Sequence, residues 1–142
     1  MMKLQVNSKD LGSIYEALSG ITRSTYEQGL SQQIYSVPAA RGTVNMRRIR
    51  LREGMELNWF DASFREPVTI DVGVDYPHLE IACTLSGQGC WETDGNVRSY
   101  GLSPGLSTFV YMRDKKMHTE LLPKDNFLHM ELRIDPRHFE IC

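Results

Sequence analysis

The chain has 142 residues, of which 41% are hydrophobic and 24% charged, and its formal net charge is −2. This length suits one domain with a sizeable buried core, and no apolar run approaches the roughly 20 residues that span a bilayer. The small negative charge and the lack of a basic tail argue against nucleic-acid binding by this chain itself.

The cysteines and the N-terminus predict the cellular setting. The chain has three cysteines, Cys83, Cys90 and Cys142, and its first residues lead into polar sequence without a secretory signal. Cys83 lies among aliphatic residues, as a core cysteine would. An odd number of cysteines favours reduced thiols over a disulfide. We therefore expect a cytoplasmic protein with no membrane association.

The chain before position 43 is predicted to form a helix and an arm. Over Ser8 to Ser19, apolar residues recur at spacings of three, four and seven, which is typical of an amphipathic helix; they are Leu11, Ile14, Tyr15 and Leu18. Residues 21 to 32 predict a loop, and Gln33 to Val37 predict a short strand ended by Pro38. The helix either packs on the domain or belongs to a mobile arm or lid.

From Thr43 onward, apolar and polar residues alternate with the period of half-buried strands. Strands are predicted over residues 43–52, 55–61, 68–74, 79–85, 90–93, 97–102, 106–112, 117–122 and 127–134. Turn signals separate them, the clearest being Ser86 to Gly89, Asp94-Gly95 and Ser103 to Gly105. Short strands with turns every eight to twelve residues or so predict an antiparallel barrel or sandwich.

In each strand, the phase that carries the aliphatic side chains is assigned to the core. The residues expected to face inward include Ile49, Leu51, Met55, Leu57, Trp59, Val68, Ile70, Val72, Val74, Leu79, Ile81, Cys83, Leu85, Trp91, Leu128, Met130, Leu132 and Ile134. The residues expected to face outward include Arg48, Arg50, Arg52, Glu56, Asn58, Phe60, Glu80, Ala82, Thr84 and His129. Arg47 has the opposite phase to its neighbouring arginines and is expected to point inward, where it can meet an acidic or polar ligand.

The motifs of catalysis and metal binding are weak. His78 and Glu80 are two residues apart on one strand, and His118 and Glu120 repeat this spacing, but neither pair has a third well-placed imidazole. No Gly-x-Ser-x-Gly elbow occurs, and no cysteine has a signature of activation. We expect no metal, no cofactor and no catalytic residue, so the chain is predicted not to be an enzyme.

Aromatic side chains supply an argument for a ligand site. Trp59, Trp91, Tyr100 and Phe109 are large for the interior of one small barrel. Aromatic walls with a few polar groups are typical of small-molecule sites. The same side chains can also simply fill the core, and the residues alone leave both interpretations open.

The turn motifs carry a resemblance to a known family. They are Thr84-Leu85-Ser86-Gly87-Gln88-Gly89, Asp94-Gly95, Tyr100, Leu102, Pro104-Gly105 and His118. In this order they resemble the sensor domain of AraC-type transcriptional regulators, a domain of the cupin superfamily, over about residues 43 to 135. Metal-binding cupins carry a histidine shortly after the Pro-Gly, whereas Leu106, Ser107 and Thr108 follow here. That departure disfavours the enzyme cupins.

The resemblance implies a fold and a domain organisation. The fold is an all-β, antiparallel cupin-like barrel of the jelly-roll type, with a short N-terminal helix. Residues 1–42 would form the helix and arm, 43–135 the barrel, and 136–142 the start of a linker to a DNA-binding domain outside this chain. Among members of the family the N-terminal segment can fold over the ligand, which would give the Ser8 to Ser19 helix and its flanking loop a switching role.

The resemblance also implies a function. A small-molecule effector would be bound inside the barrel by Trp59, Trp91, Tyr100 and His118, with Arg47 near the mouth. DNA would be bound only through the C-terminal domain, and a homodimer remains open. The alternative function is a freestanding cupin enzyme or a sugar-binding protein.

Overall fold

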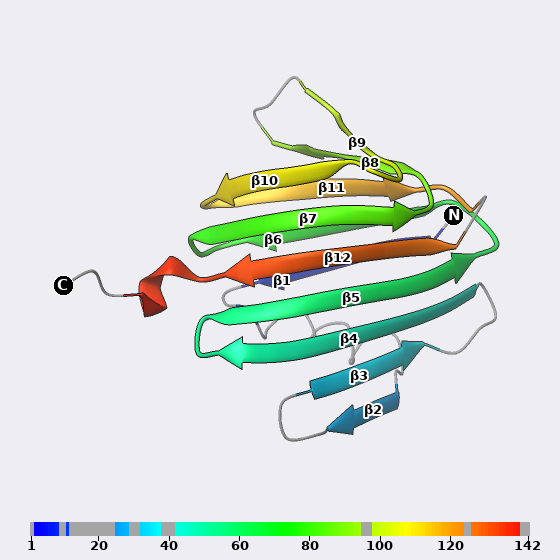
Figure 1. Ribbon diagram of the computed structural model, residues 1–142. Helices are drawn as coiled ribbons and strands as arrows, with labels where there is room; N and C mark the ends of the chain where they lie inside the picture. Colours follow the sequence, from blue (N-terminus) through cyan, green and yellow to red (C-terminus); the bar gives the residue numbers. More distant parts are fainter. Residues whose placement is uncertain are drawn as a thin grey trace.

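The chain folds as two β sheets that face each other across one interior (Figure 1). The computed structural model describes residues 2–8, 11, 25–28, 32–37, 42–94, 98–123 and 126–139. Within these residues, the five-stranded sheet has the order β1-β6-β11-β8-β9 and the seven-stranded sheet the order β10-β7-β12-β5-β4-β3-β2.

The strands pair antiparallel, except that β1 runs parallel to β6. The five-stranded sheet contains β1 (Met2–Ser8), β6 (Val68–Val74), β11 (Lys115–Leu121), β8 (Gly89–Thr93) and β9 (Tyr100–Leu102). The seven-stranded sheet contains β10 (Ser107–Met112), β7 (His78–Ser86), β12 (Phe127–Ile134), β5 (Met55–Phe64), β4 (Gly42–Arg52), β3 (Gln32–Val37) and β2 (Thr25–Gln28). A turn of 3-10 helix, η1 (Pro136–His138), follows β12. The predicted all-β antiparallel fold is confirmed.

Glycines form the tight connections that the sequence predicts. Gly54 joins β4 to β5 with φ of +76°, and Gly87 joins β7 to β8 with φ of +91°. Side chains disfavour this left-handed backbone region. A Cβ on Gly87 would also lie 2.9 Å from the Cα of Phe127. Glycine therefore allows the β7–β8 turn to pass close to the start of β12.

The apolar core lies toward one end of the interior. Its buried members come from both sheets: Ala62, Phe64, Val68, Trp91, Leu102, Leu121 and Phe127. A second cluster packs at β6, where Val72, Val74 and Tyr76 surround Leu11. Burial of these side chains contributes about 1.5–3 kcal/mol for each large aliphatic or aromatic residue.

The predicted inward phase is correct for β6 and β8 but wrong for four neighbouring strands of the larger sheet, β4, β5, β7 and β12. There the interior phase is the one expected outside, with Arg48, Glu56, Asn58, Phe60, Glu80, Ala82, Thr84 and His129 facing inward. Ile81 and Leu85, expected inside, are 42% and 48% exposed. Cys83 also lies in this outer phase rather than in the core. The buried polar groups are paired with one another, which offsets the cost of burial.

The N-terminal region contains strands that the sequence did not predict. β1 extends the smaller sheet, and β2 lies in the segment predicted as a loop, so that loop prediction is wrong. β3 confirms the strand predicted at Gln33 to Val37. Most of the helix predicted over Ser8 to Ser19 lies outside the described residues. Among the residues that are described, no helix is long and apolar enough to cross a bilayer.

Candidate functional site

A cavity of about 160 Å³ lies between the two sheets. Both sheets line its apolar end, where the large side chains are Phe64, Val68, Trp91, Leu102, Leu121 and Phe127. The charged and polar residues that line it are Glu80, Thr108, Thr119, His129, Glu131 and Arg133. The cavity is therefore apolar at one end and charged at the other.

The strand register of the larger sheet creates this division. Near the end of β12, Arg133 lies opposite Glu80 of β7 and opposite Glu56 of β5. At the start of β12, Phe127 lies opposite Ala62. Side chains that are two residues apart on a strand share one face of the sheet. The interior therefore changes from apolar at the start of β12 to charged near its end.

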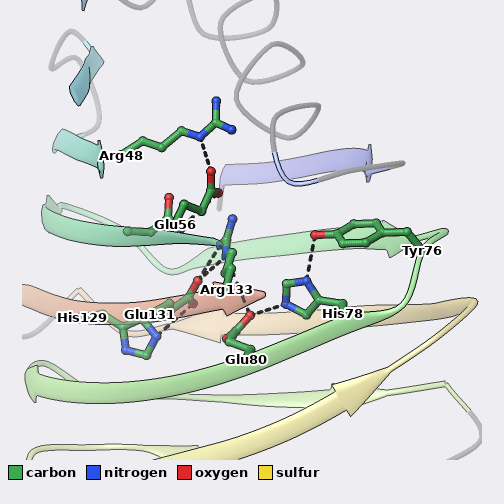
Figure 2. A network of polar contacts seen from close by, with 9 residues as sticks. Arg48, Glu56, Tyr76, His78, Glu80, His129, Glu131 and Arg133 are labelled. Atoms are coloured by element: carbon green, nitrogen blue, oxygen red, sulfur yellow. Dashed lines mark hydrogen bonds and ion pairs between the residues drawn. The ribbon is translucent and has the colours of Figure 1, made fainter. Parts of the chain in front are cut away.

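A chain of polar contacts runs across β7 and β12 at the charged end (Figure 2). Its members in order are Tyr76, His78, Glu80, Arg133, Glu131, His129 and Thr84. Arg133 Nε and Nη2 donate to Glu131 Oε2 at 2.8 and 2.5 Å, and Arg133 Nε lies 3.8 Å from Glu80 Oε2. The guanidinium thus lies between two carboxylates that face the cavity.

Each carboxylate is also paired with an imidazole. His78 Nε2 lies 2.7 Å from Glu80 Oε2, and His129 Nε2 lies 3.0 Å from Glu131 Oε1. The other ring nitrogens contact hydroxyl groups, with Tyr76 Oη 2.8 Å from His78 Nδ1 and a threonine hydroxyl 2.9 Å from His129 Nδ1. Both ring nitrogens of each imidazole therefore have a partner, a carboxylate at Nε2 and a hydroxyl at Nδ1.

A second buried pair lies beside this chain of contacts (Figure 2). Arg48 Nε donates to Glu56 Oε2, and Asn58 Nδ2 donates to Glu56 Oε1 at 3.2 Å. Asn58 is fully buried with an exposed fraction of 0%, yet its Oδ1 has no hydrogen-bond partner among the described residues. Buried polar atoms are usually hydrogen-bonded. Within the described part of the chain, Asn58 Oδ1 is therefore an exception to this rule.

The electrostatics at the charged end keep Glu131 ionised. Burial alone would raise the pKa of its carboxyl, but the charge of Arg133 and the hydrogen bond from His129 outweigh burial and hold that pKa well below its ordinary value. Opposite charges in a cavity with few polar neighbours interact more strongly than they would in water. Glu131 and Arg133 thus form a stable ion pair on the cavity wall.

The structure brings together two of the predicted ligand-binding residues. Trp91 is 8% exposed and lines the cavity, and its ring stacks on that of Tyr100 with 4.5 Å between centroids. Tyr100 is half-buried and packs against the apolar core. These two side chains form one aromatic wall that is continuous with the interior.

The other predicted residues lie away from the cavity. Trp59 lies on the opposite face of β5 from the cavity-lining Phe60, so its predicted inward placement is wrong. Arg47 is exposed next to inward-facing Met46, which also contradicts the prediction. Phe109, considered for the interior, is 69% exposed.

His118 lies on the outer face of the smaller sheet. Its Nδ1 lies 2.5 Å from Asp71 Oδ1, and its Nε2 lies 3.2 Å from Glu120 Oε1. These hydrogen bonds, that to Asp71 most of all, raise the pKa of the imidazole above 6.5. His78 lies on the inner face of the larger sheet. The pair His78 and Glu80 is therefore separated from the pair His118 and Glu120. No group of three or more metal-ligating side chains occurs within the described part of the chain.

The charged end is defined by five residues that were not predicted as ligand-binding residues from the sequence: Glu56, Glu80, His129, Glu131 and Arg133. A signal for them was present, because their strand phases repeat charges of both signs at spacings of two. A solvent-exposed face tolerates such a pattern, but so does a buried ion-pair network. The period alone does not distinguish the two.

A family comparison identifies the class of domain. The family model described as "Regulatory protein PchR N-terminal domain" matches residues 41–142. The chain belongs to this family. The predicted resemblance to the N-terminal domains of AraC-type regulators is thereby confirmed. A comparison with curated protein sequences found no match.

Solved structures share the fold of this PchR-type domain. A putative mannose-6-phosphate isomerase from Ralstonia eutropha JMP134 is 14% identical with a TM-score of 0.54, and the match covers 70% of this chain and 91% of that chain. The AraC-like transcriptional activator CuxR is 11% identical with a TM-score of 0.51, over 68% of this chain and 34% of CuxR. At these identities the likeness concerns the fold alone.

Proposed function

We propose that this PchR-type domain is the sensor of a transcriptional regulator and that it binds a small-molecule effector in the cavity between its sheets. The observation that carries the proposal is the cavity of about 160 Å³, with Trp91 at one end and the ion pair of Glu131 and Arg133 at the other. Small-molecule sites typically combine apolar walls with a few precisely placed polar groups. The family supplies the regulatory context.

In this proposal the domain has no catalytic role. Trp91 and Tyr100 would pack against the apolar part of the effector, and the charged end would orient its polar part. The roles predicted for Trp59, His118 and Arg47 would require contacts outside this cavity. The domain would work in the cytoplasm as part of a longer protein, and binding to DNA would take place through a C-terminal domain.

Effector binding can regulate such a protein only if the effector binds one conformation better than another. Residues 1–42 would supply the alternative arrangements, residues 43–135 the binding site, and residues 136–142 the connection onward. Deleting residues 1–40 from the full-length regulator should therefore change effector affinity or regulation. Unchanged affinity and unchanged regulation would contradict this part of the proposal.

A cavity-filling variant tests the binding site. Ala82 lines the cavity and is buried, whereas the next residue, Cys83, lies on the outer face of β7. Ala82→Leu should abolish binding of any compound found in a thermal-shift screen of sugars, aromatic acids, amines and metal chelates. Cys83→Leu is the matched control and should leave binding unchanged. Binding that survives Ala82→Leu in a folded protein would contradict the proposal.

The second candidate function is a freestanding cupin enzyme or a sugar-binding protein. The observation that favours this second function is that one solved structure with this fold is described as a putative mannose-6-phosphate isomerase. Elemental analysis of purified protein separates the candidates, since stoichiometric iron, zinc, nickel or manganese would favour the enzyme. A reading frame with two helix-turn-helix patterns after this domain would favour the regulator.

A further inference from the structure

We propose that the outer face of the larger sheet is the contact surface of a homodimer, in which the same face of a second copy of this chain packs against it across a two-fold axis. The proposal concerns assembly and does not depend on an effector in the cavity. Four features of this face support it: its exposed apolar side chains, their strand register, their lack of charge and their breadth.

Large apolar side chains are exposed on the outer face of the larger sheet. On β10, Phe109 and Tyr111 are 69% and 59% exposed, and on β7, Ile81 and Leu85 are 42% and 48% exposed. A single exposed apolar residue is ordinary, whereas a contiguous patch of more than a few hundred Å² is rare on a monomeric protein and marks an interaction site. The strand register decides between these two cases.

The register makes these side chains neighbours. Phe109 lies opposite Ile81, Ile81 lies opposite Leu132 of β12, and Leu132 lies opposite Leu57 of β5. The next row along the same four strands contains Tyr111, Leu79, Ile134 and Met55. Side chains that lie opposite each other on paired strands are in contact distance. The two rows therefore form one outer apolar patch across β10, β7, β12 and β5, which lie side by side in Figure 1.

The strands at the centre of this face carry no charge in the outward phase. The outward residues alternate from Leu79 to Leu85 on β7 and from Leu128 to Ile134 on β12, and all of them are aliphatic, methionine or cysteine. On β10 they are Ser107, Phe109 and Tyr111. In a two-fold contact, a residue near the axis meets its own copy. A charged residue there would meet a like charge, which is costly, so these three strands meet the electrostatic requirement of such a contact.

The breadth of the apolar surface selects the occupant. Four strands are about 19 Å wide, and β12 rises about 20 Å from Leu128 to Ile134, which gives roughly 400 Å² in projection. A helix, about 10–12 Å in diameter, would cover only part of this width, whereas a second sheet packs face to face over all of it. Each partner of a standard interface buries about 800 Å², in an apolar centre with a polar rim. The patch is large enough to be that centre, and a second copy of the sheet has the matching breadth.

The mass of the protein in solution tests the proposal. Sedimentation velocity of the 142-residue chain at micromolar concentration should give the mass of two chains. Ile81→Asp should raise the dimer Kd about 100-fold or more, because the contact would bury a carboxylate without a counter-charge. Leu122→Asp is the matched control, since Leu122 is 46% exposed but follows β11 of the smaller sheet. This control should leave the dimer intact.

A second variant keeps the test decisive if Ile81→Asp fails to fold. Phe109 is the more exposed of the two residues and lies on the edge strand β10, so the monomer depends less on it for stability. Phe109→Asp should weaken the dimer in the same direction, with circular dichroism confirming that the strands are retained.

Three results would overturn the proposal. A monomer at every concentration would leave the outer apolar patch to the rest of a longer protein or to a different partner. A dimer that persists in both folded patch variants would place the contact on another surface. A dimer that Leu122→Asp weakens as much as the patch variants do would show that the effect is not specific to this face.

Discussion

At the charged end of the cavity, the two faces of the larger sheet reverse the usual relation between polarity and burial. On the inner face, Glu80 of β7, Arg133 of β12 and Glu56 of β5 form one row across neighbouring strands. One residue further along each of β7 and β5, the outer face carries Ile81 and Leu57, which lie in one row with Leu132 of β12. Ile81 is 42% exposed, whereas Glu56 is 1% exposed.

In this row, charged side chains are buried while aliphatic side chains are exposed, which is the opposite of what the hydrophobic effect alone would favour. Aliphatic side chains on the surface are common in proteins, whereas buried charges are uncommon and must be paired. Replacing a buried ion pair with apolar residues is often neutral or stabilising. A network of paired charges next to an apolar cavity is therefore consistent with the proposed binding site.

The largest expected effect comes from breaking the interior network. Arg133→Met removes the cation between two carboxylates and should lower the free energy of unfolding by about 3–5 kcal/mol, because uncompensated charge stays buried. Urea denaturation measures the change. Arg113→Met, at a residue whose side chain is 68% exposed, is the control and should stay within about 0.5 kcal/mol. Equal free energies of unfolding for the two variants would show that the buried arginine stabilises the protein no more than the exposed one, which would contradict the prediction.

The two tryptophans sharpen the comparison. Trp91→Ala opens the apolar core and should cost about 3–5 kcal/mol, whereas Trp59→Ala on the outer face should cost about 1 kcal/mol. The expected difference between the variants is thus about 2–4 kcal/mol. Chemical denaturation of both proteins measures this difference. A larger loss of stability for Trp59→Ala than for Trp91→Ala would mean that the core lies on the face of β5 that carries Trp59, contrary to the structure.

Acid should destabilise the interior. The folded-state pKa of Glu131 is lowered from 4.5, so its contribution to stability is present in full above the unfolded-state value and is lost as the pH falls toward the folded-state value. Glu131→Gln should therefore flatten the decrease in stability below about pH 4.5, as followed by urea denaturation at a series of pH values. A profile as steep as that of the parent protein would argue against this ion pair.

The smallest effect is expected at the outer face of the smaller sheet. The pKa of His118 is raised above 6.5 by Asp71 and Glu120, so its stabilising effect is complete below the unfolded-state pKa and is lost as the pH rises through the folded-state pKa. Solvent screening limits the effect to less than about 1 kcal/mol. His118→Gln should remove this pH dependence, and thermal unfolding between pH 6 and 9, roughly the range of an imidazole with a raised pKa, tests it.

Much of the fold could be predicted from the sequence, because strand period and turn residues are local properties. The alternation from Thr43 onward and glycines such as Gly54 and Gly87 marked the strands and connections correctly. Hydrophobic phase also placed Val72 and Trp91 in the interior. These signals depend on neighbouring residues along the chain.

The charged end of the cavity could not be predicted in the same way. A period of two separates the faces of a strand without saying which is inside, and the aliphatic rule assigned Ile81 inward and Glu80 outward. Glu80 is buried because Arg133, which is 53 positions further along the chain, and His78 lie beside it. Such partners become visible only when the register between strands is known.

The most direct test of the account uses the two tryptophans as reporters of the two faces. The chain has two tryptophans, so protein labelled with 5-fluorotryptophan gives two ¹⁹F resonances, which Trp59→Phe assigns. With a compound from the thermal-shift screen, the account predicts that the Trp91 resonance shifts at stoichiometric ligand while the Trp59 resonance stays in place. A shift of Trp59 with Trp91 unchanged would contradict an effector site inside the barrel.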